Sequence, residues 1–218
     1  MAKKIIRAMF TGDSVTDCGR LRPVGDGAGT LGDSYVGNIY VQTWANNPQN
    51  NVRFFNSATS GDTTRKLAAR FDEEVLAYAP DYVFIMIGIN DCWRFFDDSI
   101  LKPEHQISSE ESEKNLEEMV TKTIAAGAVP VVISPLFFDT NKNDPMRAKR
   151  DELERRFLSV TRKYGVDYID IQPAADDFIS KASSYMLAQD RVHPKAIGRA
   201  IITKEIMNHP AFRAMLEK

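Results

Sequence analysis

A serine near the N-terminus has the type and setting that nucleophilic catalysis requires. Ser14 lies in the string FTGDSVTD (residues 10–17), directly after an apolar stretch, residues 4–10, that is short enough for a buried strand. Gly12 allows an unusual backbone, and Asp13 and Ser14 suit the start of a helix. A serine at such a turn exposes its hydroxyl beside the free N–H groups of the helix, which suit a developing oxyanion. Taken alone, the string is more typical of a simple capped helix start.

A general base is available near the other end, in the string DRVHP (190–194). Asp190 lies three residues before His193, and within one turn this spacing can bring the carboxylate to the Nδ1–H while Nε2 faces a nucleophile. Of the other two histidines, His105 lies among charged and polar loop residues and His209 lies near the C-terminus. His193 is therefore the best candidate, although an Asp-X-X-His pair is more often a helix cap beside a surface histidine.

Two further residues that follow strand patterns could complete an oxyanion hole. Residues 81–87 predict a buried parallel strand that leads into GIND (88–91), so Asn90 falls at a carboxyl end, where open α/β sheets place their sites. Its side-chain amide can donate a hydrogen bond. Residues 52–56 predict another strand, which leads to Gly61, whose N–H would meet a ligand with no Cβ in the way. As single residues, Gly61 is typical of a turn and Asn90 of a loop cap.

Strand and helix patterns alternate along all 218 residues, without a linker or a repeat. Further strands are predicted at 129–134 and 166–170, and helices at 34–46, 64–78, 109–126, 145–164 and 195–207. The alternation predicts one α/β domain, residues 1–218, in which a central parallel sheet of about five strands is covered on both faces. Residues 21–32 and 92–107 are predicted to be loops, and loops of that length are often functional.

The chain resembles the SGNH hydrolases, also called GDSL-type esterases, in four signature residues that occur in the family's order: Ser14, Gly61, Asn90 and His193. The resemblance extends from residue 10 to residue 194. It implies a flavodoxin-like α/β/α sandwich and ester hydrolysis through an acyl-serine, with Ser14 as nucleophile, His193 as base and Asp190 as its orienting acid. It also implies an oxyanion hole formed by the N–H groups of Ser14 and Gly61 and the Asn90 amide.

Within this family the chain looks most like bacterial carbohydrate acetylesterases, which include the acetylxylan esterases. The similarity rests on the strings DCGR (17–20), GINDCWR (88–94) and DPMR (144–147). It implies removal of acetyl groups from acetylated carbohydrates, with xylo-oligosaccharides as one candidate substrate. Two positions depart from the relatives: Ala58 replaces a usual glycine, and Gln189 stands where a tryptophan usually precedes the DRVH string. A flat stacking surface for a sugar is therefore missing or displaced.

Substrate contacts are expected next to the catalytic residues. The face of Trp93 can pack on a sugar while Arg94 reaches its hydroxyl groups. We also expect Asp13, beside the nucleophile, to contact the substrate. The aromatic run at residues 93–96 is equally typical of a hydrophobic plug or a subunit contact, so a homo-oligomer stays open as an alternative.

Composition excludes several partners. The net charge of −2 suggests neither nucleic acid nor an anionic membrane as a partner, and no apolar run approaches the roughly 20 residues that span a bilayer. Arg7 interrupts the N-terminal apolar run, which argues against a signal peptide. Cys18 and Cys92 are too few for a disulfide framework and are interpreted as reduced thiols. These features predict a cytoplasmic protein that acts on a small-molecule ester.

Other functions fit the sequence less well. The string GAGTLG (27–32) fits a dinucleotide-binding pattern, but it does not follow a strand. No closely spaced metal-ligand cluster occurs, so neither a metal nor a cofactor is expected, and Ser14 lacks the G-X-S-X-G setting of α/β-hydrolases. A lysophospholipase or thioesterase of the same family, and a non-catalytic module that binds an anion at the Ser14 helix, remain as alternatives.

Overall fold

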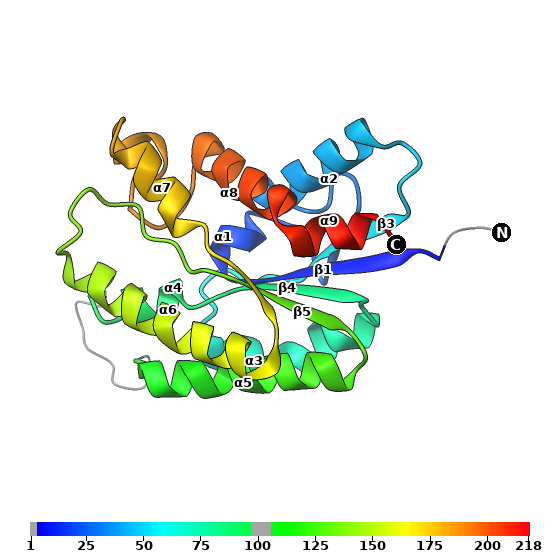
Figure 1. Cartoon of the computed structure of the whole chain (residues 1–218), viewed down its shortest axis with the longest axis horizontal. Coiled ribbons are helices and arrows are strands. Elements are labelled where there is room, and N and C mark those ends of the chain that lie inside the picture. The colour runs from blue at the N-terminus through cyan, green and yellow to red at the C-terminus, as the bar shows by residue number, and fades with distance from the viewer. Residues whose placement is uncertain (1–3, 97–105) are drawn as a thin grey trace.

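The computed structural model describes residues 4–96 and 106–218 as a three-layer α/β/α sandwich (Figure 1). The central sheet has six strands in the order β2-β3-β1-β4-β5-β6. Their bounds are β1 (Ile6–Gly12), β2 (Gly25–Asp26), β3 (Val52–Asn56), β4 (Tyr82–Met86), β5 (Val129–Ile133) and β6 (Asp167–Ile169). Among the described strands, β2 alone pairs antiparallel, at the edge against β3. Without it, the parallel strands follow the flavodoxin-like order 2-1-3-4-5, so the predicted fold is confirmed with one short strand more than expected.

Helices cover both faces of the sheet (Figure 1). Their bounds are α1 (Ser14–Asp17), α2 (Tyr35–Asn46), α3 (Thr64–Glu74), α4 (Ile89–Trp93), α5 (Ser109–Ala125), α6 (Pro145–Tyr164), α7 (Gln172–Ile179), α8 (Ala196–Asn208) and α9 (Pro210–Leu216). On one side α8 packs on α2, α7 and α9; on the other, α5 packs between α3 and α6. The five predicted helices are present, although α3 ends at Glu74 and a separate 3-10 turn follows.

The loop predicted at 92–107 is only partly described. Its first residues, Cys92 and Trp93, belong to α4 instead of a loop. Residues 97–105 of that loop, and with them His105, lie outside the described residues.

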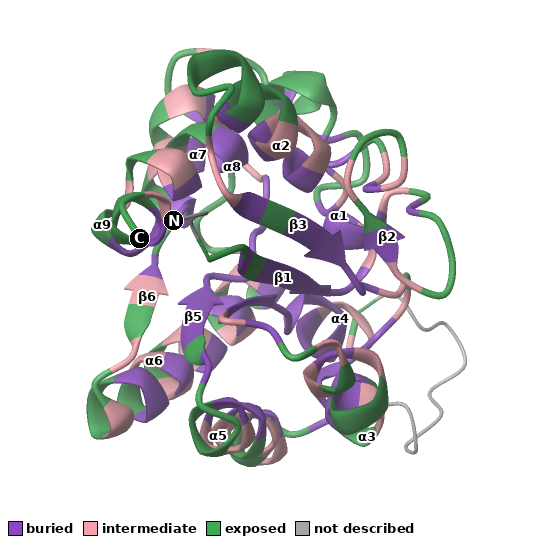
Figure 2. Cartoon of the chain, turned by 90° about the vertical axis from the view of Figure 1, so that its right-hand side faces the viewer, coloured by how far each residue is buried: buried purple, intermediate pink, exposed green. Residues whose placement is uncertain are grey.

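The core is built around the apolar central strands, which are mostly buried, whereas the edge strands β2 and β6 also carry exposed residues (Figure 2). Every residue of β4 is buried, as a parallel strand covered on both faces requires. On the central strand β1, Phe10 stacks on Phe84 with ring centroids 4.6 Å apart and meets Tyr35 of α2 edge-on at 6.1 Å. This packing fixes β1 and β4 against each other, so the turns at their carboxyl ends start from a rigid frame.

Candidate active site

The turn that leads to Ser14 joins β1 to α1. Gly12 has φ +151°, and a Cβ at this position would lie 1.9 Å from the carbonyl oxygen of Met86 on β4. Glycine is therefore required where the two strands end side by side. Asp13 follows as the N-cap of α1, and its side chain accepts a hydrogen bond from the Val15 N–H at 3.0 Å. Ser14 is thereby placed as the first residue of the helix, with its N–H among those that have no partner within the helix.

Ser14, His193 and Asp190 are brought into one hydrogen-bonded series. The Ser14 Oγ lies 2.7 Å from His193 Nε2, and His193 Nδ1 lies 2.5 Å from Asp190 Oδ2. The three residues come from opposite ends of the chain and meet at the carboxyl edge of the sheet. This geometry suits a serine nucleophile, an imidazole base and a carboxylate that orients the base.

The carboxylate of Asp190 is held by its own turn. Its Oδ1 accepts hydrogen bonds from the N–H groups of Val192 at 3.0 Å and His193 at 2.8 Å. Partial burial alone would raise the pKa of Asp190, but the hydrogen bonds from the His193 N–H, the His193 ring and the Val192 N–H outweigh it and lower the pKa below its ordinary value. Asp190 therefore stays ionised and can stabilise a protonated imidazole.

The two other predicted oxyanion donors also lie at strand ends. Asn90 is in the first turn of α4, after β4, and one of its amide hydrogens is donated to the Asp62 carbonyl at 2.8 Å. Since a primary amide has two hydrogens, this bond orients Asn90 and leaves the second hydrogen for another acceptor. Gly61 lies in the loop after β3 with φ +82°, and a Cβ there would meet no atom within 4 Å. Glycine is thus required for the backbone conformation, and the space beside it is open.

The loop that carries Gly61 is held by side chains that the sequence did not single out for this role. Arg20 is 4% exposed; its Nε donates to the Ala58 carbonyl at 2.6 Å and its Nη2 to the Ser57 carbonyl at 3.1 Å. From the other side, Arg70 donates to the same Ser57 carbonyl at 2.7 Å. Burial, with Arg22 and Arg70 nearby, lowers the pKa of Arg20 to about 10, still well above neutral pH. Ala58 therefore supplies a carbonyl to Arg20 despite departing from the family's usual glycine.

Two acids add to this support. Asp17 accepts hydrogen bonds from the N–H and the hydroxyl of Ser60, at 2.8 and 2.7 Å. Arg70 also binds the carboxylate of Asp62 at 2.7 Å, and the carbonyl of Asp62 is the group that orients Asn90. The loop of Gly61 and the amide of Asn90 are therefore positioned together.

Two buried carboxyl groups, Asp13 and Asp91, directly adjoin Ser14 and Asn90 in the chain. Burial raises the pKa of Asp13 to about 7, with a further contribution from Asp91 and Asp62, against the hydrogen bond from Val15. Burial likewise raises the pKa of Asp91 to about 6, although Asp91 accepts hydrogen bonds from the Thr64 N–H and the Ser112 hydroxyl.

Aromatic and basic residues border the triad. The indole of Trp93 meets the ring of His193 edge-on, with centroids 5.5 Å apart, and the Arg94 guanidinium lies 5.4 Å from the centre of the Trp93 ring. The next residue, Phe95, lies against Lys149 of α6. Asp13, the third predicted substrate contact, is 1% exposed and faces the start of α1.

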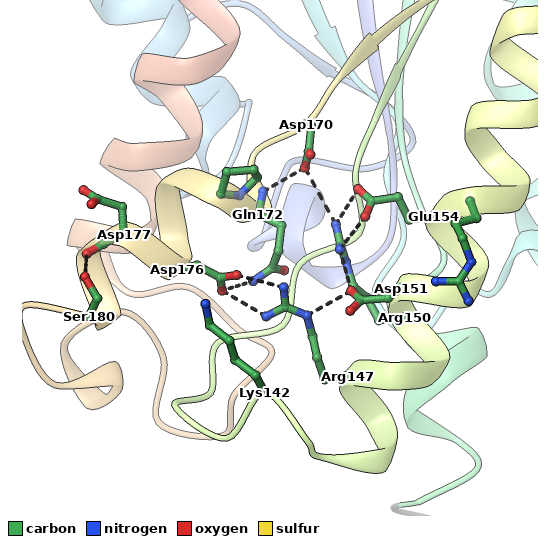
Figure 3. Close-up of a pocket in the computed structure, with 12 residues that line it drawn as sticks. Lys142, Arg147, Arg150, Asp151, Glu154, Asp170, Gln172, Asp176, Asp177 and Ser180 are labelled. Carbon is green, nitrogen blue, oxygen red and sulfur yellow. Dashed lines mark hydrogen bonds and ion pairs between the residues drawn. The ribbon is translucent and has the colours of Figure 1, made fainter.

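A cavity lies away from Ser14, Asp190 and His193. It has a volume of about 620 Å³, is lined by residues of α6, β6–α7 and α7, and contains none of the triad residues (Figure 3). Two of its arginines form ion pairs: Arg147 binds Asp176 and Asp151, and Arg150 binds Glu154. The cavity is thus lined by a charge network that joins α6 to α7.

The described residues also bear on the two cysteines, on potential metal ligands and on membrane-spanning helices. Cys18 is half-buried and Cys92 is buried, and both are free thiols; burial raises the pKa of Cys18 to about 11 and raises the pKa of Cys92 further. Within residues 4–96 and 106–218, no group of three or more potential ligand side chains is placed to hold a metal ion. In the same described ranges, no helix is long and apolar enough to cross a membrane.

Comparison with known proteins confirms the family resemblance. The model of the GDSL-like lipase/acylhydrolase family matches residues 10–201. An acetylxylan esterase of Geobacillus stearothermophilus is 35% identical over 207 residues, which cover 94% of each protein. The crystal structure of Axe2, an acetylxylan esterase of the same organism, superposes with a TM-score of 0.89 at 34% identity over 95% of each chain. LAE5, an alpha/beta hydrolase enzyme from the metagenome of Lake Arreo, Spain, has a TM-score of 0.90 at 32% identity over 100% of each chain. The chain belongs to the GDSL-like lipase/acylhydrolase family.

Proposed function

We propose that this protein is a serine esterase that removes acetyl groups from acetylated carbohydrates through an acyl-serine intermediate. The observation that carries the proposal is the series from Ser14 Oγ to His193 Nε2 at 2.7 Å and from His193 Nδ1 to Asp190 Oδ2 at 2.5 Å. The similarity to acetylxylan esterases supports the acetylated-carbohydrate substrate, with xylo-oligosaccharides as one candidate.

The first half of the reaction follows from these contacts. His193 Nε2 takes the Ser14 proton while Oγ attacks the carbonyl carbon of the acetyl ester. The imidazolium that forms is stabilised by Asp190, which already accepts its Nδ1–H. His193 then gives the proton to the sugar oxygen as it leaves, and Ser14 remains acetylated. In the second half a water molecule loses a proton to His193 and attacks the acetyl-serine. The bond between the acetyl carbon and Ser14 Oγ breaks, His193 returns the proton to Oγ, and acetic acid leaves and ionises to acetate.

Negative charge develops on the former carbonyl oxygen in both halves. In this proposal the Ser14 and Gly61 N–H groups and the second Asn90 amide hydrogen donate to it. The bond from Asn90 to the Asp62 carbonyl and the arginine contacts of the Gly61 loop orient these donors before substrate binds. Such preorganised donors stabilise the transition state more than the ground state.

Substrate contacts are assigned to the exposed border of the site. Trp93 lies beside His193 and Arg94 lies beside Trp93, and in this proposal the sugar of a bound ester contacts both. We assign Asp13 to the support of the nucleophile turn, because its carboxyl group is buried and caps α1. A cytoplasmic location, suggested by the two free thiols, belongs to the same proposal and is tested by cell fractionation.

One activity screen tests the proposal against its alternatives. We expect hydrolysis of p-nitrophenyl acetate and of acetylated xylo-oligosaccharides, with a steep loss of activity as the acyl chain lengthens. A preference for long acyl chains or for acyl thioesters would favour a lysophospholipase or a thioesterase. No turnover of any ester, together with no labelling by a serine-directed phosphonate, would favour an anion-binding module.

A further inference from the structure

The catalytic turn contains an arginine in an unusual backbone conformation. Arg191, between Asp190 and His193, has φ +68°, the left-handed region that residues with a Cβ seldom adopt. The turn at this residue brings the N–H groups of Val192 and His193 onto Asp190 Oδ1, at 3.0 and 2.8 Å. The remaining oxygen, Oδ2, is then directed at the His193 ring. The alignment of acid and base thus depends on an unfavourable conformation at Arg191, which the surrounding contacts must hold.

Contacts from the segment between β5 and α6 supply this support. The Arg191 carbonyl accepts a hydrogen bond from the Phe138 N–H at 2.8 Å. Its guanidinium binds the carboxylates of Asp139 at 3.1 Å and Asp144 at 3.0 Å, and lies 5.2 Å from the centre of the Phe137 ring. Backbone and side chain of Arg191 are therefore both attached to the same short segment.

A buried side chain of α7 holds the segment between β5 and α6. Gln172, 2% exposed at the start of α7, accepts a hydrogen bond from the Phe137 N–H and donates one to the Phe137 carbonyl, both at 2.9 Å. The amide of Gln172 also donates to Asp176, which Arg147 of α6 binds (Figure 3). Asp144 is at the same time the N-cap of α6. The residues that line the charged cavity between α6 and α7 thus support the segment to which Arg191 is attached.

We propose that Arg191 is a positioning residue whose ion pairs with Asp139 and Asp144 hold the catalytic turn in the conformation that aligns Asp190 with His193. The inference rests on the proposed function, because it takes Asp190 and His193 as acid and base. It adds a role for the charge network between α6 and α7, which the reaction itself does not use. The side chain of Arg191 is 46% exposed, so its replacement leaves the core intact.

The test compares variants from the two sides of the ion pair. Arg191→Asn keeps a residue that tolerates the left-handed conformation but cannot reach the acids, and we expect kcat to fall about tenfold with KM little changed, as for a small misplacement of reacting groups. Asp139→Asn keeps the acceptor for the Asn141 N–H and weakens the same pair, so it should lower kcat in the same direction. The double variant should be no worse than Arg191→Asn, because both changes remove one interaction. Arg191→Lys should recover part of the loss, and exposed Arg162→Asn is the matched control.

A second measurement separates positioning from other roles. If Arg191 holds the Asp190–His193 pair, the midpoint of kcat/KM against pH should move in Arg191→Asn and in Asp139→Asn but not in the control. A rise in KM alone, with Asp139→Asn unaffected, would overturn the proposal in favour of direct substrate binding. A lower Tm with unchanged kcat and pH profile would overturn it in favour of a purely structural role. Ser14→Ala and His193→Ala are measured in the same assays. If these two variants keep activity, the proposed function fails. If they are inactive while Arg191→Asn has the kcat and pH profile of the wild type, only the positioning role is rejected.

Discussion

The buried carboxyl group beside the nucleophile should make the protein less stable as the pH rises. Asp13 is 1% exposed, and burial raises its pKa from 3.8 to about 7, with Asp91 and Asp62 contributing in the same direction. Its side chain accepts a hydrogen bond from the Val15 N–H at 3.0 Å. Asp13→Asn keeps an oxygen that can accept this bond and cap α1, while removing the charge that Asp13 acquires at higher pH.

The sign and size of the effect follow from proton linkage. Because the pKa of Asp13 is higher in the folded than in the unfolded chain, the folded state binds the proton more tightly between about pH 4 and pH 7. The contribution of Asp13 to stability is therefore fully present below pH 4 and is lost as the pH rises through about 7. The interval between the two pKa values corresponds to about 4 kcal/mol. At about pH 8 we expect the free energy of unfolding of Asp13→Asn to exceed that of the wild type by up to about 4 kcal/mol. At about pH 4 the two free energies of unfolding should agree.

Urea denaturation of both proteins across this pH range measures the effect. The raised pKa of Asp91 adds a pH dependence to both proteins, so the difference between them reports Asp13 together with its interaction with Asp91. Asp177→Asn, at a carboxylate whose side chain is 66% exposed, is the control and should change stability by no more than about 0.5 kcal/mol at either pH. Equal stabilities of Asp13→Asn and wild type at pH 8, or a difference that is the same at both ends of the range, would refute the reasoning.

Three further predictions concern the residues of the site. Asn90→Ala should lower kcat by about 10²–10³ with a smaller change in KM, since it removes one preorganised donor; steady-state kinetics would show a change in KM alone if Asn90 only bound substrate. Asp190→Asn should lower kcat by about 10³–10⁴ and move the midpoint of the kcat/KM rise to lower pH, because the imidazolium loses its stabilising carboxylate; an unmoved pH profile would mean that another group orients the base. Gly61→Ala should reduce the free energy of unfolding by about 1–2 kcal/mol, because an alanine at φ +82° is strained even where its Cβ has open space. An unchanged stability in thermal denaturation would contradict this reasoning.

The sequence predicted the parallel sheet and the convergence of the site because both depend on local patterns. Each residue proposed as catalytic or as an oxyanion donor follows an apolar strand or lies in a short string of its own, and the carboxyl ends of parallel strands share one edge of the sheet. The family resemblance then assigned roles to Ser14, Asn90 and His193, and the structure places Ser14 and His193 in contact.

The supporting contacts could not be predicted in the same way, because they join positions far apart in the chain. Arg20 reaches Ser57 and Gln172 reaches Phe137, and nothing in the local sequence of an arginine or a glutamine indicates which carbonyl it binds. The strand β2 has only two residues, too few for a period-two pattern, and α1 and α4 are too short for helical periodicity. The prediction of a single domain over residues 1–218 stays a prediction.

The acyl-serine intermediate is tested most directly by covalent labelling of the nucleophile. The wild type, Ser14→Ala and His193→Ala are incubated with a p-nitrophenyl phosphonate, analysed by intact mass and peptide mapping, and assayed in parallel on p-nitrophenyl acetate. We expect one label per wild-type chain, on Ser14, with esterase activity falling in step with labelling; Ser14→Ala should be unlabelled and inactive, and His193→Ala should label far more slowly. Ester hydrolysis that survives full labelling, or a Ser14→Ala variant that keeps substantial turnover of acetyl esters, would contradict the account.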